Sequence, residues 1–128
     1  MMWLQGPTLV IVRSSTGHTF GGYATAPWTT AGAYINVGGC FLFLVENPYN
    51  DAPTCFECQA TMHAMYCAAT HGPTFGSGHD ICIHPGADGG QSYTNFPNNY
   101  TDTLGRASAT FTGAHNYTVE DYEVWAVT

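Results

Sequence analysis

The sequence predicts a mainly β domain, a sandwich of two antiparallel β-sheets with little helix. Apolar residues alternate or form short β-branched runs, and no window has the i, i+3, i+4 stripe of an amphipathic helix. Turn-forming residues separate about seven or eight such runs at close spacing. Charged residues make up only 9% of the 128 residues, so small polar residues and tyrosines must cover the surface.

The first strand is predicted at residues 8–13, a run rich in β-branched side chains. Residues 14–17 have the composition of a hairpin turn, and residues 18–24 are the expected partner strand. Within that partner, Gly21 and Gly22 indicate a bulge or a close approach of another backbone segment.

The next segment, residues 27–39, is rich in Gly, Thr and Ala and is predicted to be a loop that places Trp28 on a sheet. Residues 40–45 are apolar on both faces, which is typical of a central strand covered on both sides. Two prolines and several Asn and Asp residues end that strand at residues 46–53.

The middle of the chain is harder to interpret. Residues 55–69 begin like a turn, whereas residues 62–67 alternate like a strand and run directly into a Gly-rich loop at residues 71–79. A strand at residues 80–84 follows, with Ile81 and Ile83 on one face and Cys82 on the other.

The last part is predicted to contain a turn at residues 85–90, a long loop at residues 91–103, and strands at residues 108–112 and 118–127. The final strand alternates strictly, so its acidic cluster is expected on the solvated side. That cluster consists of Glu120, Asp121 and Glu123.

Charge excludes two classes of partner. The chain has a formal net charge of -7, and its only basic residues are Arg13 and Arg106. Nucleic-acid binding requires a basic surface to neutralise phosphates, and an anionic membrane surface repels an acidic protein. No run of 18 or more apolar residues is present, so membrane insertion is not expected.

An extracellular or cell-surface location is expected, with a cytoplasmic location as the alternative. Asn99 and Asn116 each begin an Asn-Tyr-Thr sequon, which predicts N-linked glycans on a secreted chain. Five cysteines allow at most two internal disulfides and leave one thiol over. The first residues lack the basic and long apolar regions of a signal peptide, so we expect processing or a longer precursor if the chain is secreted.

Several blocks of residues, taken in the order in which they occur, resemble the TLDc domain family over nearly the whole chain. The closest likeness is to the protist type, in which a Gly-Pro-Thr-Phe-Gly-Gly-Gly-His-Asp-like loop precedes a strand. The blocks are residues 6–23, Trp28, residues 41–43, 71–83, 92–96, 111–113 and 119–125.

The resemblance implies a β-sandwich whose helices come largely from the part preceding Gly6. Residues 1–128 are therefore expected to be a single domain that is incomplete at its N-terminus. The family implies no established catalytic machinery, so no enzyme activity is expected. Its animal members are known as oxidation-resistance proteins and as regulators that bind the vacuolar proton pump through flanking helices.

Metal binding is the main chemical alternative, although no metal or cofactor is expected. Cys55-x2-Cys58 and Cys67-x3-His71 have the residue types and pair spacing of a structural zinc site. The competing interpretation makes Cys67 part of a core strand and leaves Cys55 and Cys58 as loop thiols or disulfide partners.

The Gly-rich loop is expected to have a structural role rather than a catalytic one. His79 and Asp80 could act as a base and its orienting group, but Ser77 lies on the same loop without the context of a nucleophile elbow. In the structural interpretation, glycines supply positive φ angles and the polar side chains bind loop amides. The residues concerned are Gly72, Pro73, Gly76, Gly78, His79 and Asp80.

A carbohydrate-binding surface is a further alternative, because sugar faces stack on aromatic rings. Core packing is the competing explanation for most of the aromatic residues involved. These are Tyr93, Phe96, Tyr100, Tyr117, Tyr122 and Trp125.

Together these features predict a non-catalytic interaction module, structural or self-assembling, whose partners are other copies of the chain. The segment before Gly6 or residues 26–39 is expected to pack against a neighbouring copy, since exposed sheet edges accept another strand. The alternatives are a stress-protection protein, a proton-pump regulator, a zinc-stabilised domain and a carbohydrate-binding domain.

Overall fold

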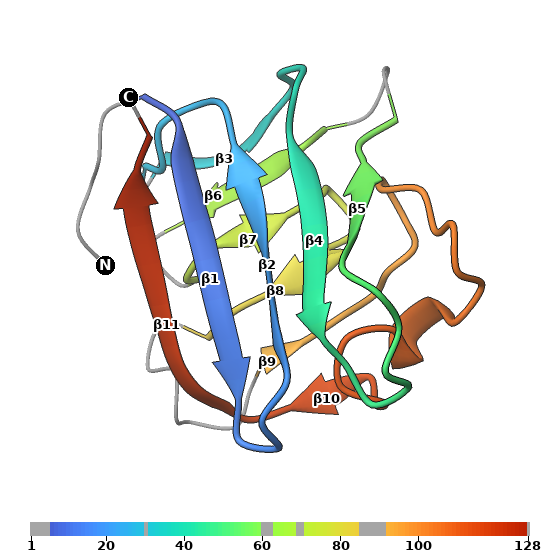
Figure 1. Ribbon diagram of the computed structural model, residues 1–128. Helices are drawn as coiled ribbons and strands as arrows, with labels where there is room; N and C mark the ends of the chain where they lie inside the picture. The colour runs from blue at the N-terminus through green and yellow to red at the C-terminus, as the bar shows by residue number, and fades with distance from the viewer. Residues whose placement is uncertain (1–5, 30, 60–62, 69–70, 85–91, 128) are drawn as a thin grey trace.

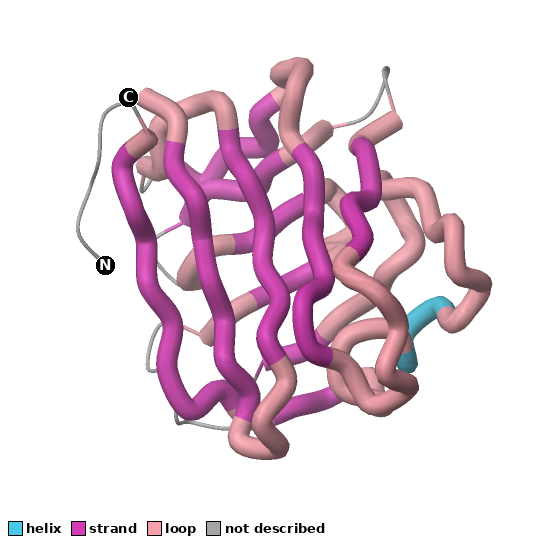
Figure 2. The backbone as a smooth tube through the Cα atoms, in the orientation of Figure 1, coloured by secondary structure: helices cyan, strands magenta, loops and turns pink. Residues whose placement is uncertain are grey.

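The computed structural model describes residues 6–29, 31–59, 63–68, 71–84 and 92–127. They form two antiparallel sheets packed face to face, as predicted, with the strands of the rear sheet crossing those of the front sheet (Figure 1). Among the described residues, helix is limited to the short 3-10 segment Ala107–Ala109 (Figure 2). No helix in the described part has the length and apolarity to cross a bilayer.

The front sheet has five strands in the order β11-β1-β2-β4-β5. Sequence neighbours pair as hairpins, and the C-terminal strand β11 pairs with β1. The strands are β1 Thr8–Ser14, β2 Thr19–Ala24, β4 Phe41–Glu46, β5 Thr54–Glu57 and β11 Val119–Ala126.

The rear sheet has six strands in the order β10-β9-β8-β7-β6-β3. Most of them are very short, so this sheet depends on loops at least as much as on its ladders. The strands are β3 Ala31–Ile35, β6 Met65–Ala68, β7 Thr74–Phe75, β8 Ile81–Cys82, β9 Ser92–Tyr93 and β10 Asn116–Tyr117.

The core between the sheets is aromatic. Trp28 is buried against the edge of Phe75, with ring centroids 5.3 Å apart, and its indole N–H donates to the Thr8 hydroxyl at 2.9 Å. Satisfying that N–H allows a tryptophan to be buried. The other large buried rings are Phe20, Phe56, Phe96, Tyr100 and Phe111.

The predicted close approach at the paired glycines is present. A Cβ atom on Gly21 would lie 1.9 Å from the carbonyl oxygen of Val10, and one on Gly22 would lie 2.5 Å from the Phe75 ring. Glycine at these two positions therefore lets β2 lie tightly against β1 and against the rear sheet.

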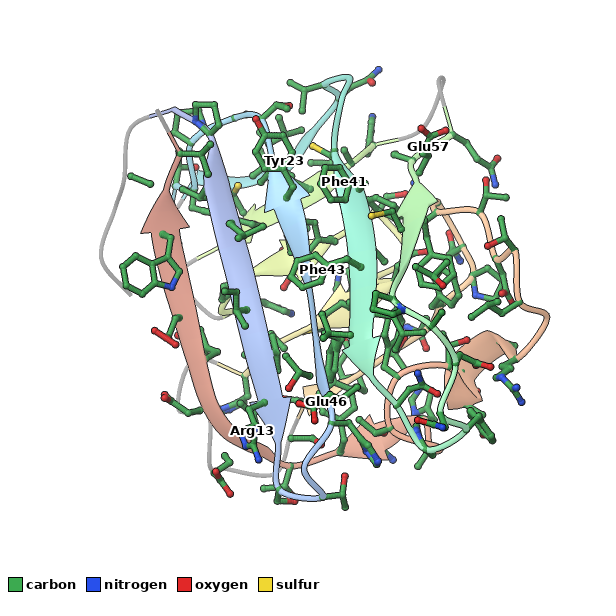
Figure 3. All side chains as sticks on the ribbon, viewed as in Figure 1. Arg13, Tyr23, Phe41, Phe43, Glu46 and Glu57 are labelled. Atoms are coloured by element: carbon green, nitrogen blue, oxygen red, sulfur yellow. The ribbon has the colours of Figure 1, made fainter. Side chains whose placement is uncertain are left out.

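Two strand predictions need correction in the first half of the chain. Residues 27–39 are not wholly a loop, because β3 lies within them and pairs with β6. The strand predicted at residues 40–45 is β4, but it is not covered on both faces by other elements. Its Leu42 faces the core, whereas Phe41 and Phe43 are half-buried on the outer face of the front sheet (Figure 3).

The strand predicted at residues 108–112 is also wrong, because this segment forms the 3-10 turn and a following turn. The Asp102 carboxylate accepts the amides of Leu104, Gly105 and Ala107, and the Thr110 hydroxyl donates to the Ala107 carbonyl. These local side-chain bonds compete with a ladder and fix the turn.

The ambiguous segment at residues 55–69 and the predicted long loop at residues 91–103 both contain strands, so the loop prediction is corrected. Residues 55–69 contribute to both β5 and β6, one in each sheet. Residues 91–103 contain β9, and Tyr100 forms an isolated bridge with Cys58. The predicted strand at residues 80–84 is shorter than expected and covers only Ile81–Cys82.

Candidate functional site

The Gly-rich loop is held by the carboxylate of Asp80, which is completely buried. It accepts the backbone N–H groups of Asn98 at 2.7 Å, of Asn99 at 2.9 Å and of Tyr100 at 3.0 Å. Burial raises the pKa of the Asp80 carboxyl, and the amide hydrogen bonds oppose that shift. The contact joins the loop to residues 98–100.

The glycines of this loop fit close to that carboxylate and to its surroundings. Gly76 has a φ of 87°, and a Cβ there would lie 2.1 Å from the Asp80 carboxylate. A Cβ on Gly72 would lie 2.6 Å from the Ile83 carbonyl oxygen, and one on Gly78 would meet the Asn98 side chain at 2.1 Å. Larger residues would push the loop away from its supports.

The base-and-orienter arrangement considered for His79 and Asp80 is not formed in this structure. Asp80 directs its carboxylate to the loop amides, whereas the Nδ1 atom of His79 shares a hydrogen bond of 2.7 Å with the Tyr93 hydroxyl. The Ser77 hydroxyl is engaged with the Asn99 side chain.

A glycan on Asn99 is incompatible with this fold, which corrects one predicted glycosylation site. The residue is completely buried, and its side-chain N–H group donates to the His63 carbonyl at 3.0 Å and to the Ser77 hydroxyl at 2.9 Å. Its side-chain oxygen accepts the Gly78 amide at 3.3 Å. The other sequon residue, Asn116, is exposed at the start of β10.

The structure does not bring the four residues of the considered zinc set together. Cys55 is exposed on β5 of the front sheet, and the nearby Cys58 is half-buried, with burial raising the pKa of its thiol to about 11. Cys67 is buried on β6 of the rear sheet. Only His71 of the four belongs to a group of clustered metal-ligand atoms among the described residues.

That group has its origin in the register of the rear sheet. Consecutive ladder pairs align one residue from each of its six strands into a row, here called the outer row. Two small residues stand in its middle with a tyrosine on either side, which leaves space above them. The outer row is Tyr34, Tyr66, Thr74, Cys82, Tyr93 and Asn116.

Two imidazole rings lie in this space. His71 precedes β7 and His79 precedes β8, and their ring centroids are 5.4 Å apart. His79 stacks on Tyr66 with ring centroids 5.1 Å apart and an interplanar angle of 28°. Burial and the neighbouring His71 lower the pKa of His79, which favours the neutral form of the ring, the form that binds metals.

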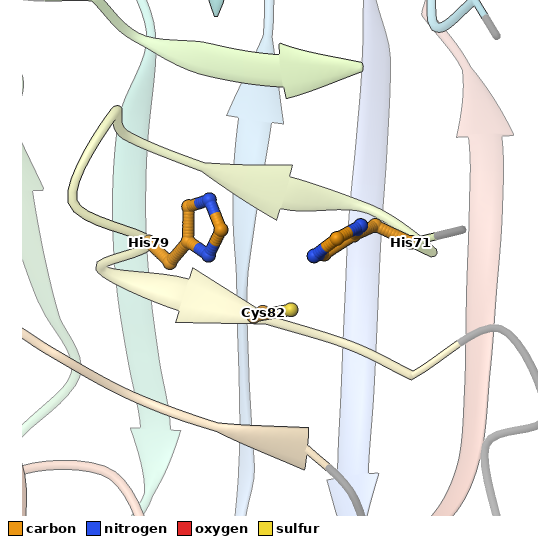
Figure 4. A group of neighbouring side chains, drawn as sticks. All are labelled: His71, His79 and Cys82. Atoms are coloured by element: carbon orange, nitrogen blue, oxygen red, sulfur yellow. The ribbon is translucent and has the colours of Figure 1, made fainter. Parts of the chain in front are cut away.

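Cys82 completes the group. One ligand atom each from His71, His79 and Cys82 lies within 4.8 Å of the other two, with the sulfur on β8 close to both rings (Figure 4). The Thr74 hydroxyl donates to this sulfur at 3.6 Å. Burial raises the pKa of the Cys82 thiol, while hydrogen bonds with Thr74 and Tyr93 lower it.

The zinc set predicted from the sequence did not include His79 or Cys82, because it was built on two pairs of closely spaced residues, one of them Cys-x2-Cys. The sequence did contain a signal for this group. His71 precedes the first strand of one short hairpin, His79 lies in its turn, and the spacing His79-x2-Cys82 leads into its second strand. Thr74 lies directly across the ladder from Cys82, so only a small side chain stands beside the sulfur.

The aromatic residues considered for sugar binding do not share one surface. Phe96, Tyr100 and Tyr117 are buried in the core. Tyr93 belongs to the outer row of the rear sheet, whereas Trp125 lies on β11 of the front sheet.

A second candidate surface is the side of β11 that faces away from β1, at the edge of the front sheet. Among the described residues, no strand pairs with that side of β11. The Val127 N–H donates to the Pro7 carbonyl at 3.0 Å. Because antiparallel bonding alternates along a strand, Tyr122, Val124 and Ala126 direct their backbone N–H and C=O groups outward.

One row of residues on the exposed face beside this edge is apolar. Trp125 is 55% exposed and aligns with Leu9, Tyr23 and Phe41 across four strands. Tyr23 and Phe41 are stacked, with ring centroids 5.2 Å apart, and both lie on the outer face in Figure 3. The row leads from the β11 edge toward the middle of the sheet.

Comparison with protein families finds one match. The model of the TLDc domain matches residues 2–128, which is essentially the whole chain. No curated protein matches the chain in sequence.

Proposed function

The chain belongs to the TLDc domain family, and we propose that it is a non-catalytic interaction module that assembles with copies of itself through β11. Family membership indicates a protein-interaction or stress-protection module. The observation that carries the finer proposal is the side of β11 that no strand of the described residues pairs with. β11 is an eight-residue strand with outward-directed backbone groups on that side and the exposed Trp125 beside them. Such an edge is a template for another strand.

One register makes β11 complementary to itself. A two-fold axis at Val124 pairs Val124 with Val124 of the second copy, and pairs Tyr122 with Ala126 in both directions. Every outward N–H and C=O of these three residues is then bonded, because they occupy the hydrogen-bonded positions of the new ladder. The two front sheets become one continuous sheet.

The same register suits the charges of β11. Glu123 lies opposite Trp125 of the second copy, and Asp121 lies opposite Val127. No acidic side chain therefore has another directly across from it, an arrangement that would be destabilising. Trp125 is covered in part by the neighbouring strand, which reduces the area of an exposed apolar side chain.

Sedimentation velocity over a concentration series tests the proposal, with Ala126→Pro as the decisive variant. Ala126 is exposed and its N–H faces outward, so proline removes a bond of the proposed ladder without removing one between β1 and β11. We expect a concentration-dependent dimer for the wild type and a monomer for Ala126→Pro. Ala126→Val is the matched control, because it keeps the N–H, and it should dimerise.

Two results would contradict self-assembly through β11. One is a wild-type protein that remains monomeric at high concentration, which would favour a strand from a different protein as the occupant of the edge. The other is unchanged dimerisation of Ala126→Pro, which would place the contact elsewhere. Thermal unfolding of each variant shows whether the monomer is still folded.

An extracellular or cell-surface location remains part of the proposal. It is supported by the exposed sequon at Asn116 and by a net charge of -7 carried on a surface without lysine. Glycosylation of Asn116 on protein recovered from its native source would support it.

A further inference from the structure

We propose that His71, His79 and Cys82 form a binding site for a divalent transition-metal ion of the zinc type on the outer face of the rear sheet. The site lies on the β7–β8 hairpin, in the sheet opposite the one that contains β11. The inference is therefore independent of self-assembly through the β11 edge.

The donor set selects the class of ion. Two imidazole nitrogens and one thiolate sulfur are borderline-to-soft ligands, which suit Zn²⁺ and disfavour Mg²⁺ and Ca²⁺. Sites with three protein ligands leave a fourth position for water. His71 and His79 are both partly exposed, so an ion can reach the ligands from solvent and a water molecule can complete the coordination.

The spacing is close to what such an ion requires. Tetrahedral bonds of about 2.0–2.3 Å hold ligand atoms roughly 3.3–3.5 Å apart. The three ligand atoms here lie within 4.8 Å of one another, so no separation must close by more than about 1.5 Å. In the proposed site this closure comes from small adjustments of the partly exposed His71 and His79 side chains, and the buried Cys82 sulfur stays in place. These adjustments keep the contacts of His79 with Tyr66 and Tyr93.

The surroundings orient the ligands. The Tyr93 hydroxyl contacts the Nδ1 atom of His79 at 2.7 Å, and Tyr93 lies directly across the ladder from Cys82, so it stands beside two of the ligands. Tyr66 stacks on His79 and contacts His71 edge-on. Outer-shell partners of this kind fix ring orientation and raise affinity at metal sites.

The experiment titrates metal-depleted, reduced protein with Zn²⁺ in competition with a chromophoric chelator, and with Co²⁺ as an optical probe. We expect one ion per chain and a thiolate-to-cobalt charge-transfer band. Cys82→Ser should abolish the band and weaken Zn²⁺ binding by at least about 100-fold, more than the ~10–100-fold effect of losing an outer-shell partner. Tyr93→Phe should weaken binding within that smaller range.

Two further variants separate this site from adventitious binding. His71→Gln changes a partly exposed residue outside any strand, so it tests the site even if Cys82→Ser is poorly folded. Cys55→Ser removes an exposed thiol on the other sheet and should leave affinity and band unchanged. Binding below one ion per chain, or binding unaffected by both Cys82→Ser and His71→Gln, would overturn the proposal.

Discussion

The Asp80 carboxylate accepts the backbone N–H of Tyr100 at 3.0 Å, and both residues are completely buried. Asp80 begins the β8 arm of the short hairpin, and Tyr100 forms an isolated bridge with Cys58, the residue that follows β5. The Tyr100 hydroxyl donates in turn to the Ala64 carbonyl at 2.7 Å. A single carboxylate thereby ties the rear sheet, the 98–100 loop and the entry to β6 together.

Asp80→Asn should destabilise the fold by about 2–3 kcal/mol, because an amide nitrogen would replace one acceptor and face buried N–H donors. Urea unfolding followed by tryptophan fluorescence measures the loss. Glu120→Gln, at an exposed acidic position, is the control and should change stability by less than about 0.5 kcal/mol. Equal stability of Asp80→Asn and wild type would show that the amide bonds are dispensable.

Gly22→Ala should destabilise the protein by about 1–3 kcal/mol, since the new methyl group would lie 2.5 Å from the Phe75 ring, which must move away from its packed position. The same unfolding measurement applies. Gly38→Ala is the matched control, because a Cβ there meets nothing within 4 Å. Adding Phe75→Leu to Gly22→Ala should cost less than the sum of the two single changes; strict additivity would argue against a steric conflict.

The hairpin of β1 and β2 was predictable because a run of β-branched residues is followed by a turn-forming segment, and the strand β11 because its side chains alternate over eight residues. The 3-10 turn at Ala107–Ala109 was not, since its residues have strand-like composition and the bonds to Asp102 that fix it come from an earlier segment. β3 was missed because glycine and alanine occupy most of it.

The cluster of His71, His79 and Cys82 was beyond sequence reasoning for a different reason. It depends on the register of strands two residues long, which carry no periodic signal. The pairing of Thr74 with Cys82 sets the space in which the imidazole rings lie. The positive φ of Gly76 is a local property that residue type indicates. The amides that Asp80 binds belong to residues 98–100, far along the chain, and nothing in the sequence pattern indicated that contact.

Glycosylation should distinguish the two sequons. When the chain is directed through a secretory pathway, the folded product is expected to carry a glycan on the exposed Asn116 and none on the buried Asn99. Peptide mapping before and after enzymatic deglycosylation identifies the occupied site. Asn116→Gln should abolish the change in gel mobility that enzymatic deglycosylation causes. A glycan found on Asn99 in folded protein would contradict the packing of that side chain.

Association through β11 should strengthen with ionic strength. Each copy carries a formal charge of -7, and at 0.01 M salt the screening length of about 30 Å leaves two copies repelling one another over the whole contact. At 0.1 M the screening length falls to about 10 Å, so the dimer dissociation constant should decrease several-fold. Sedimentation equilibrium at both salt concentrations measures this dissociation constant.

Glu123→Gln removes one charge per copy at the proposed contact and should make the dissociation constant less dependent on salt. Glu57→Gln, on the opposite edge strand, should reduce the salt dependence less. A dimer that weakens as salt rises would mean that attractive charges hold it together, which the acidic β11 pairing does not provide.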